Sequence, residues 1–290
     1  MTSALQTFTN PAAFLSEAQP FLEAHESRNN LVLGMSIRLI EHPDWTSAPP
    51  FLALLRQDGQ PRLAALMTPP GRLLLSNNPQ LPLDHSSEAL DRLCDQLLSG
   101  SWIVSGVNAE NTLACQFADR WARATGAACQ VGHRLRIYEL RQVIPLPHPP
   151  TGILRPAKPE DYETITGWHH ALQIEAMGEG DLESSRKIVA QRLSSGDIFV
   201  WDDNRPVSMA LRSRPTRHGC TIGGVYTPPA LRGRGYASAC VAALSQYLLD
   251  SGKQFCNLYT DLTNPTSNSI YQKIGYSPIC DCLDYTFEAG

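Results

Sequence analysis

The sequence predicts an α/β protein built from two domains. Its 290 residues are about twice the length of a typical domain of about 150 residues. Strand patterns alternate with helix patterns in both halves, and four of the six residues from Pro145 to Pro150 are prolines. Because prolines forbid a helix and favour an extended chain, we interpret residues 145–152 as a linker between domains at 1–144 and 153–290.

The composition excludes several classes of protein. Charged residues make up 18% of the chain and hydrophobic residues 42%, which argues against intrinsic disorder and against a coiled coil. The net charge of -4 argues against wholesale binding of nucleic acid or of anionic membranes. The longest uncharged stretch, from Met1 to Ser16, is rich in polar residues and shorter than the ~20 apolar residues of a membrane span.

The same survey predicts a cytoplasmic protein that holds no metal. No lysine or arginine precedes Arg28, so the basic start of a secretory signal is missing. The eight cysteines lack C-x-x-C spacing, and several fall in apolar runs, as expected of buried thiols in a reducing compartment. His169-His170 and Cys280-x-Cys282 have no partner spacing for a metal site.

The C-terminal half begins with a strand and a helix and continues as a mixed pattern. Asp203-Asn204 has the composition of a hairpin turn, and residues 235–250 carry one apolar helical stripe that ends before Ser251-Gly252. The expected strands span 153–157, 198–201, 207–214, 221–227, 255–260 and 282–287. One expected helix begins at Pro159, and two others span 235–250 and 268–274.

The N-terminal half repeats this order faintly. A hairpin around Asp58-Gly59 joins predicted strands at 51–57 and 62–68. The further expectations are strands at 72–76, 102–105 and 133–141 and helices at 86–98 and 109–125. Two copies of one α/β unit account for this order, although hairpins and strand-helix alternation also occur in unrelated α/β domains.

The segment from Val225 to Ala237 predicts a strand, a glycine-rich loop and the start of a helix. Unpaired backbone N–H groups and the helix dipole attract a phosphate at such a place. Gly233 and Gly235 let an anion reach the backbone, and the bidentate donors of the flanking Arg232 and Arg234 suit a pyrophosphate.

Other phosphate-binding loops do not fit the spacing. The only Gly-Lys pair, Gly252-Lys253, is followed by Gln254, which excludes a P-loop. The dinucleotide pattern G-x-G-x-x-G is incomplete, because Ser238 stands at its third glycine. The remaining alternative is a Gly-Arg surface turn before an amphipathic helix.

Three spaced motifs resemble one family. Arg232-x-x-Gly235-x-Ala237 matches the Q/R-x-x-G-x-G/A signature of the GNAT superfamily of acyl-CoA-dependent N-acyltransferases. Residues 264–276 resemble the family's N-x-x-A-x-x-L-Y-x-x-x-G-F segment, with Ser267, Ile270 and Tyr276 as departures, and the strand at 153–157 resembles its opening strand. The resemblance covers residues 153–287 and implies a mixed, mostly antiparallel sheet flanked by helices.

The resemblance also implies acetyl-CoA as the cosubstrate and roles for particular residues. The implied CoA-binding residues are Val225, Tyr226, Thr227, Arg232, Gly233, Arg234, Gly235, Tyr236, Ala237 and Asn264. The pantetheine arm would lie along residues 225–227, braced by Asn264, and the pyrophosphate would bind the amides of residues 232–237. Tyr271 would be the general acid that protonates the departing CoA thiolate, although a core tyrosine on a short helix fits the same pattern.

The general base is harder to assign. Deprotonating an amine of lysine-like pKa at pH 7 costs about 4.6 kcal/mol, so such an acceptor needs a base. Many relatives carry a Glu on the strand before the pyrophosphate loop, but residues 221–227 contain no carboxylate. Glu175 is the best candidate, followed by Glu179 and Asp261, and each is also consistent with a solvated surface acid.

Two other regions bear on ligand binding. Arg212, Arg214 and Arg217 could meet an adenosine 3′-phosphate or an acidic acceptor, with a solvated basic edge as the default interpretation. In the first half, the loop at 76–84 stands where the pyrophosphate loop would be and contains neither glycine nor arginine. We therefore expect a degenerate GNAT-like domain that does not bind CoA in this way and helps to shape the acceptor cleft.

The expected function is transfer of an acetyl group from acetyl-CoA to a primary amine by direct attack in a ternary complex. The acceptor would be a small molecule or a peptide, and neither nucleic acid nor a membrane is an expected partner. One alternative is an enzyme that transfers a longer acyl group. Another is a non-catalytic acyl-CoA sensor, which the missing strand carboxylate favours.

Overall fold

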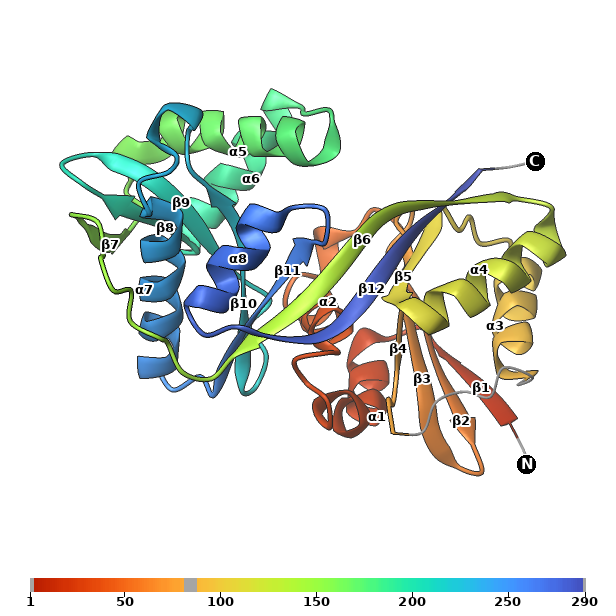
Figure 1. The fold of residues 1–290 in the computed structure, drawn as a ribbon. Coiled ribbons are helices and arrows are strands. Elements are labelled where there is room, and N and C mark those ends of the chain that lie inside the picture. The colour runs from red at the N-terminus through yellow and green to blue at the C-terminus, as the bar shows by residue number, and fades with distance from the viewer. Residues whose placement is uncertain (1–2, 81–87, 289–290) are drawn as a thin grey trace. The chain divides into compact units, whose positions relative to one another are not determined.

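The computed structural model describes residues 3–80 and 88–288 (Figure 1). Each half of the chain contains the same elements in the same order: a strand, two helices, three strands, a helix, a strand, a helix and a final strand. The α/β fold and the repetition of one unit are therefore confirmed.

The elements of the first half occupy residues up to 140. They are β1 (Ser3–Phe8), α1 (Pro11–Glu23), α2 (Asn30–Glu41), the short 3-10 helix η1 (Pro43–Trp45), β2 (Phe51–Gln57), β3 (Gln60–Met67), β4 (Leu73–Asn77), α3 (Glu88–Ser99), β5 (Gly106–Glu110), α4 (Asn111–Thr125) and β6 (Ala128–Leu140).

The elements of the second half follow the proline-rich segment. They are β7 (Ile153–Pro156), η2 (Pro159–Asp161), α5 (Tyr162–Met177), α6 (Leu182–Ser194), β8 (Ile198–Asp202), β9 (Pro206–Ser213), β10 (Gly219–Tyr226), η3 (Pro229–Leu231), α7 (Tyr236–Asp250), β11 (Phe255–Asp261), α8 (Pro265–Lys273) and β12 (Ser277–Glu288).

The sheet is mixed and mostly antiparallel, as predicted. Hydrogen bonds join its twelve strands in the order β1-β2-β3-β4-β5-β12-β6-β11-β10-β9-β8-β7. The pairs β4–β5 and β10–β11 are parallel, whereas the hairpins β2–β3 and β8–β9 are antiparallel. Each half thus has one parallel pair at the same place in its element order.

Contacts divide the chain into two compact units that are not continuous in sequence. The first contains the residues up to Ile137, the segment Thr260–Asn264 and the chain from Pro278 onward; the second contains Tyr138–Tyr259 and Pro265–Ser277. The last strand explains this division, because β12 pairs antiparallel with β5, with Leu283 opposite Ala109. The domain boundaries 1–144 and 153–290 remain a prediction about the two repeats in the sequence. The compact units do not follow these boundaries, because the first unit also takes in Thr260–Asn264 and the chain from Pro278 onward.

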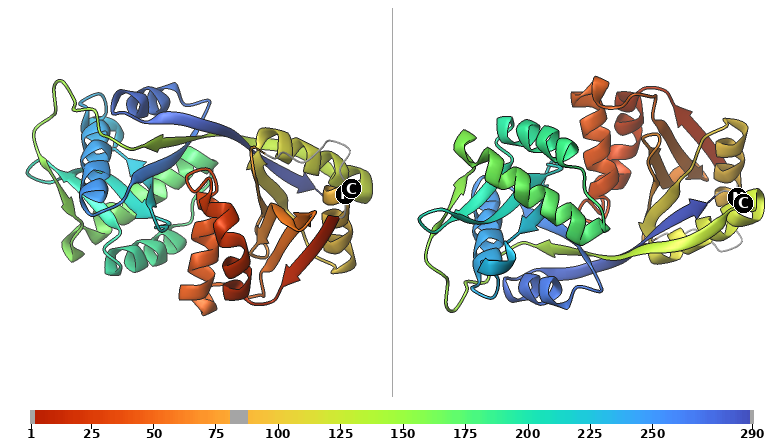
Figure 2. Two further views of the ribbon diagram at one scale, coloured as in Figure 1. Left: turned by 90° about the horizontal axis from the view of Figure 1, so that it is seen from below. Right: turned by 90° about the horizontal axis from the view of Figure 1, so that it is seen from above.

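In the first unit, helices cover both faces of the sheet. Phe51, Ala53 and Leu55 of β2 pack with α3 and α4, whereas the alternate residues Leu52 and Leu54 pack with α1 and α2. Figure 2 shows these two helix pairs on opposite sides of the strands. Burial of both faces explains why β2 and β3 are almost continuously apolar.

The second unit repeats this layering. Phe199 and Ile222 belong to the core under α7 and α8, and Ile198, Val200 and Met209 belong to the core under α5 and α6 (Figure 1). The pyrophosphate-loop candidate leads into α7, and Glu175 lies on α5. The two sides of the candidate site therefore come from opposite layers of one sheet.

The proline-rich segment packs along the second unit. The Ile144 amide donates to the Ile274 carbonyl at 3.0 Å, and the indole N–H of Trp201 donates to the Thr151 carbonyl at 2.9 Å. A Cβ built on Gly235 would lie 3.7 Å from Cδ of Pro150, so this proline lies against the glycine-rich loop. The segment forms neither a helix nor a strand, and hydrogen bonds near both of its ends hold it to the second unit.

The structure corrects one expectation about the first half and adds elements that were not predicted. Residues 102–105 form no strand, and β5 begins only at Gly106. Trp102 packs edge-on against Phe51 at 5.4 Å between ring centroids and Val104 is buried, whereas Ile103 is 79% exposed, so the apolar run is only partly core. The strand and two helices at residues 3–41 were not predicted, and part of the predicted loop at 76–84 and the start of the helix at 86–98 lie outside the described residues.

Within residues 3–80 and 88–288, no helix is both long enough and apolar enough to cross a membrane.

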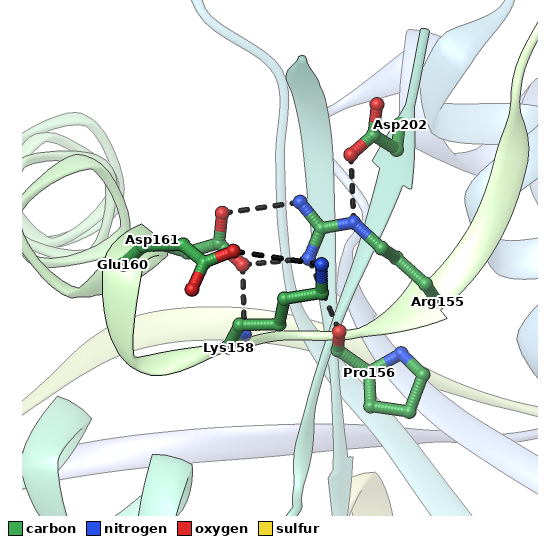
Figure 3. Close-up of polar contacts among 6 residues, drawn as sticks. All are labelled: Arg155, Pro156, Lys158, Glu160, Asp161 and Asp202. Atoms are coloured by element: carbon green, nitrogen blue, oxygen red, sulfur yellow. Dashed lines mark hydrogen bonds and ion pairs between the residues drawn. The ribbon is translucent and has the colours of Figure 1, made fainter. Parts of the chain in front are cut away.

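A buried charge network anchors the start of α5. The Arg155 guanidinium on β7 donates to both carboxylate oxygens of Asp161, at 2.7 and 3.1 Å, and its Nε donates to Asp202 at 2.6 Å (Figure 3). The Asp161 carboxylate also accepts from the Lys158 amide at 2.7 Å, and its side chain is 5% exposed. These bonds tie the entrance of α5 to strands β7 and β8.

Asp161→Ala is expected to lower the free energy of unfolding by about 3 kcal/mol, because it leaves the Arg155 guanidinium without its bidentate partner. Urea unfolding at pH 7 measures this loss. Glu160→Ala is the matched control: Glu160 is exposed and 3.5 Å from Lys158, so its loss should cost less than about 1 kcal/mol. Equal effects of the two variants would contradict the structural role of Asp161.

The difference between wild type and Asp161→Ala should also depend on pH. Burial raises the pKa of Asp161, but hydrogen bonds from Arg155 and the Lys158 amide outweigh it and hold the pKa below 3.8. A carboxyl whose pKa is lower in the folded state stabilises the fold above its unfolded pKa and loses this contribution as pH falls through the folded pKa. The stability gap should therefore be full above about pH 4 and shrink below it.

Candidate functional site

Strand β10 bulges where the candidate site begins. Its pairing with β9 is regular up to Gly223, opposite Leu211, and resumes at Tyr226, opposite Met209, so β10 carries one extra residue. Gly224 permits the bulge because its φ is +57° and because a Cβ there would collide with the Leu211 side chain.

Strands β10 and β11 then separate. Their parallel pairing joins residues 219–221 to residues 255–257 and goes no further in the described chain, although β10 continues to Tyr226 and β11 to Asp261. Two parallel strands that diverge in this way leave backbone edges between which an extended ligand can be hydrogen-bonded. The predicted pantetheine segment, residues 225–227, lies at this divergence.

The glycine-rich loop enters α7 without a capping side chain. Gly233 and Gly235 have φ values of +78° and +80°, and Gly235 is the N-cap residue. The first turn of α7 contains no acidic residue, whereas α1 and α6 are capped by the side chains of Asn10 and Asp181. Helices α2, α4 and α5 also lack a side-chain cap, so what distinguishes the N-terminus of α7 is the pair of glycines at positive φ that leads into it.

The first backbone amides of α7 precede the hydrogen bonds of the helix. The amide of Ala239 makes the first helical bond, to the Gly235 carbonyl at 3.0 Å. The amides of Tyr236, Ala237 and Ser238 precede it and have no acceptor within a helix. Gly233, Arg234 and Gly235 are exposed, so the loop is open to solvent.

Arg232 and Glu175 meet in an ion pair. Nη2 of Arg232 lies 2.8 Å from each carboxylate oxygen of Glu175, and its Nε donates to the Thr227 carbonyl at 2.9 Å. The guanidinium carbon is 5.6 Å from the ring centroid of Tyr226, whose hydroxyl lies 3.5 Å from Glu175 Oε1. Arg232 thus joins the loop to β10 and α5, and its guanidinium is already occupied.

Sequence reasoning missed a serine behind this arrangement. Ser208 on β9 is fully buried; its hydroxyl lies 3.0 Å from the Tyr226 carbonyl and 2.9 Å from the Thr227 hydroxyl. It holds the end of β10 in place beyond the bulge. A buried serine in an apolar strand is its only sequence signal, and that signal does not name a partner.

Tyr271 lies in the core of the second unit. Its side chain is 8% exposed, and its ring centroid is 6.5 Å from that of Tyr138 and 6.0 Å from that of Tyr276. Burial raises the pKa of Tyr271 to about 12, and a hydrogen bond with Ser267 opposes this shift. The hydroxyl is therefore a neutral donor at every pH at which the protein would work.

The other predicted residues fall in separate places. Tyr236 is buried and donates from its hydroxyl to Asp203 at 2.8 Å, and Glu179 is exposed in the turn after α5. Asn264 belongs to the first compact unit, where its amide donates to the Asp261 carbonyl at 3.1 Å. The structure brings Glu175, Tyr226, Thr227 and Arg232 together within the second unit.

Asp261 is poorly suited to act as a base. Burial raises its pKa, but hydrogen bonds from Thr263 and His133 outweigh burial and lower it. Its Oδ1 already accepts from the Thr263 amide at 2.7 Å and from the Thr263 hydroxyl at 2.6 Å.

The basic segment at the end of β9 is not uniformly solvated. Arg212 is paired with Asp197, with 2.9 Å between Nη2 and Oδ1. Arg214 has a φ of +41°, its guanidinium lies over the Tyr259 ring at 5.6 Å, and its Nε is buried without a hydrogen-bond partner. Burial lowers the pKa of Arg214.

Comparison with known proteins identifies this architecture. The family model described as FR47-like protein matches residues 205–283, which include β10, the glycine-rich loop, α7, β11 and α8. A GCN5-related N-acetyltransferase from Sphaerobacter thermophilus aligns with a TM-score of 0.62 and 16% identity, covering 98% of this chain and 95% of its own. The chain has the fold of the GNAT acetyltransferases.

Other solved structures extend this likeness to both halves. A tandem GNAT protein from the clavulanic acid biosynthesis pathway aligns with a TM-score of 0.57 and 12% identity over 100% of this chain and 99% of its own. A Drosophila protein aligns with a TM-score of 0.69 and 13% identity over 99% of both chains. No curated protein matches the sequence. The GNAT fold therefore occurs twice, in tandem, with an FR47-like domain in the second copy.

Glu175→Gln should leave the GNAT fold intact. The side chains of Glu175 and Arg232 are 45% and 46% exposed, so removing their ion pair is expected to change the free energy of unfolding by less than about 1 kcal/mol. Urea unfolding of Glu175→Gln beside Asp161→Ala tests this difference. A loss from Glu175→Gln as large as that from Asp161→Ala would mean that Glu175 is a structural residue.

Proposed function

We propose that the protein is an acyl-CoA-dependent N-acyltransferase that transfers an acetyl group to a primary amine. The uncapped N-terminus of α7, entered through Gly233 and Gly235 beside a bulged strand that diverges from β11, is the observation that carries this proposal. The FR47-like match over the same residues and the GNAT fold support it.

In this proposal the CoA pyrophosphate binds backbone amides among residues 232–237, of which the Arg232 amide already donates to the Pro229 carbonyl at 3.2 Å. The helix dipole and unpaired N–H groups favour an anion there, and no acidic residue in the first turn repels it. Arg232 acts through the backbone geometry of the loop, because its guanidinium is committed to Glu175 and Thr227. Arg234, which is exposed, is the arginine that can reach the phosphates.

The pantetheine arm would lie along the divergence of β10 and β11. Gly224 and Val225 have no register partner on β9, so their backbone groups suit an extended amide-bearing chain. This position would bring the thioester toward α8, which carries Tyr271.

The reaction is an acyl transfer without a covalent enzyme intermediate. The amine lone pair attacks the thioester carbonyl carbon, the C–S bond breaks, and the acetyl group leaves with the amine as an amide. Proton transfer from Tyr271 to a thiolate of pKa about 8.5 is uphill by roughly 5 kcal/mol at the raised pKa of about 12. Tyr271 therefore acts by donating a hydrogen bond to the developing thiolate, whose proton comes finally from solvent.

Glu175 is the proposed base, and its pairing with Arg232 sets a condition on that role. Its two oxygens already accept from Arg232, so the amine proton passes to Glu175 through water or after the pair opens. Glu175 is already paired, and β10 itself carries no carboxylate that could replace it as the base. These two observations favour the second candidate function, a non-catalytic acyl-CoA sensor. A longer acyl group is the remaining enzymatic alternative.

Ala237→Glu tests the CoA site without disturbing the fold. A carboxylate in the first turn of α7 should stabilise the helix by up to about 1 kcal/mol while repelling a pyrophosphate. We expect calorimetric titration to show acetyl-CoA binding by wild type and at least tenfold weaker binding by the variant. Gln254→Glu adds the same charge at an exposed residue and should bind like wild type. Equal affinities for all three proteins would exclude this site.

Tyr271→Phe separates an enzyme from a sensor. Screening a panel of primary amines for release of the CoA thiol gives the activity. An acyltransferase should lose at least tenfold in kcat in this variant, with unchanged affinity for acetyl-CoA, because the hydroxyl helps only as the C–S bond breaks. Glu175→Gln should lower the rate most at low pH, where a basic amine depends on the base. Acetyl-CoA binding without turnover of any amine would favour the sensor.

A further inference from the structure

The first unit retains the framework of the proposed site with different residues on it. Strands β4 and β5 are its parallel pair, joined from Leu73 opposite Val107 to Leu74 opposite Asn108. They occupy the same places in the first copy as β10 and β11 in the second. Ligands of α/β proteins bind at the carboxyl ends of such strands, which here are Asn77 and Glu110.

A cavity of about 230 Å³ lies at these two strand ends. Its wall includes Asn77, Glu110 and Leu113, and Arg28 from the connection between α1 and α2. The volume is below the 300–1,000 Å³ typical of drug-sized ligands, so the cavity suits a small molecule. All of its lining residues belong to the first compact unit.

Among the described residues, the lining of this cavity contains one cation, Arg28, and one anion, Glu110, which form a loose ion pair. The side chains of Arg28 and Glu110 are 17% and 24% exposed, and their closest atoms are 3.9 Å apart, beyond hydrogen-bonding distance. Arg28 donates to Asn77 Oδ1 at 3.2 Å, and Glu110 Oε1 accepts from the Thr112 hydroxyl at 3.4 Å. These contacts use little of the capacity of a guanidinium with five N–H donors and a carboxylate with two acceptor oxygens.

We propose that this cavity binds a small zwitterion of the α-amino-acid class. The ligand's carboxylate would accept from the Arg28 guanidinium and the Asn77 amide, and its ammonium group would donate to Glu110. Such a ligand supplies both missing partners at once, and its charges sit side by side as those of Arg28 and Glu110 do. Half-buried charges gain most from a partner that also completes their hydrogen bonds.

Two other ligand classes fit less well. A phosphate or the CoA pyrophosphate would face the Glu110 carboxylate, and the described part of this strand end lacks the glycines that admit an anion to the backbone in the second copy. An apolar ligand would offer neither charge a hydrogen-bond partner while displacing water from both. The site is therefore distinct in chemistry from the proposed CoA site.

Binding can be tested on the full chain with each of the twenty L-amino acids. Melting curves followed by calorimetry at up to about 10 mM cover dissociation constants in the millimolar range. We expect one or a few amino acids to bind wild type. The carboxamide and the deaminated acid of the best binder should each bind at least tenfold more weakly, because each lacks one charge.

Variants place the binding in the cavity. Arg28→Gln and Glu110→Gln keep side-chain size and should each weaken the amino acid at least tenfold, whereas Arg92→Gln, on the exposed side of α3, should not. Ala237→Glu, which should block the proposed CoA site, should bind the amino acid like wild type. Weaker binding by this variant would mean that the amino acid binds beside the CoA site and not in the cavity. Circular dichroism checks that each variant is folded. If Arg28→Gln does not fold, the affinity of Glu110→Gln tests the proposal instead.

Either of two results would overturn the proposal. One is that no amino acid binds wild type in this range. The other is that an amino acid binds and both Arg28→Gln and Glu110→Gln keep wild-type affinity, which would place the ligand elsewhere in the chain.

Discussion

Parallel pairing between β10 and β11 covers three residues on each strand and then stops, and the candidate site depends on that short pairing. The paired part holds the two strands in one sheet, and their divergence leaves backbone without a strand partner where an extended ligand can bind. The bulge at Gly224 turns the end of β10, and Ser208 fixes the carbonyl of Tyr226 beyond it. The loop to α7 starts from this fixed end.

The loop itself combines a rigid side with an open side. Arg232 holds it to Thr227 and to Glu175 on α5, so the loop cannot move away from the strand without breaking charged hydrogen bonds. Gly233 and Gly235 leave the other side without side chains. The Arg155 network stabilises the same arrangement from a distance, because it fixes the start of the helix that carries Glu175.

Local features of this architecture could be predicted from the sequence, and long-range ones could not. Gly233, Gly235 and the apolar stripe of α7 are signals within a few residues, and the loop and helix lie where these signals predict them. The ion pair of Glu175 with Arg232 joins residues 57 positions apart, and no pattern in either segment names the other. The pairing of β12 with β5 is of the same kind, because alternation predicts a strand but not its neighbour. The strand predicted at 102–105 is wrong because an apolar residue such as Trp102 is found both in buried strands and in loops that pack on the core, and its sequence pattern does not separate the two.

The two copies show how one framework can serve different ligands. Both keep a parallel strand pair, and in both the sheet is covered by helices on its two faces. The residues that follow these strands differ between the copies. In the second copy they are glycines and a helix terminus without a cap, which favour an anion reaching the backbone. In the first copy, Arg28 and Glu110 place both signs of charge in a small cavity, so the same position selects a ligand by its side-chain contacts.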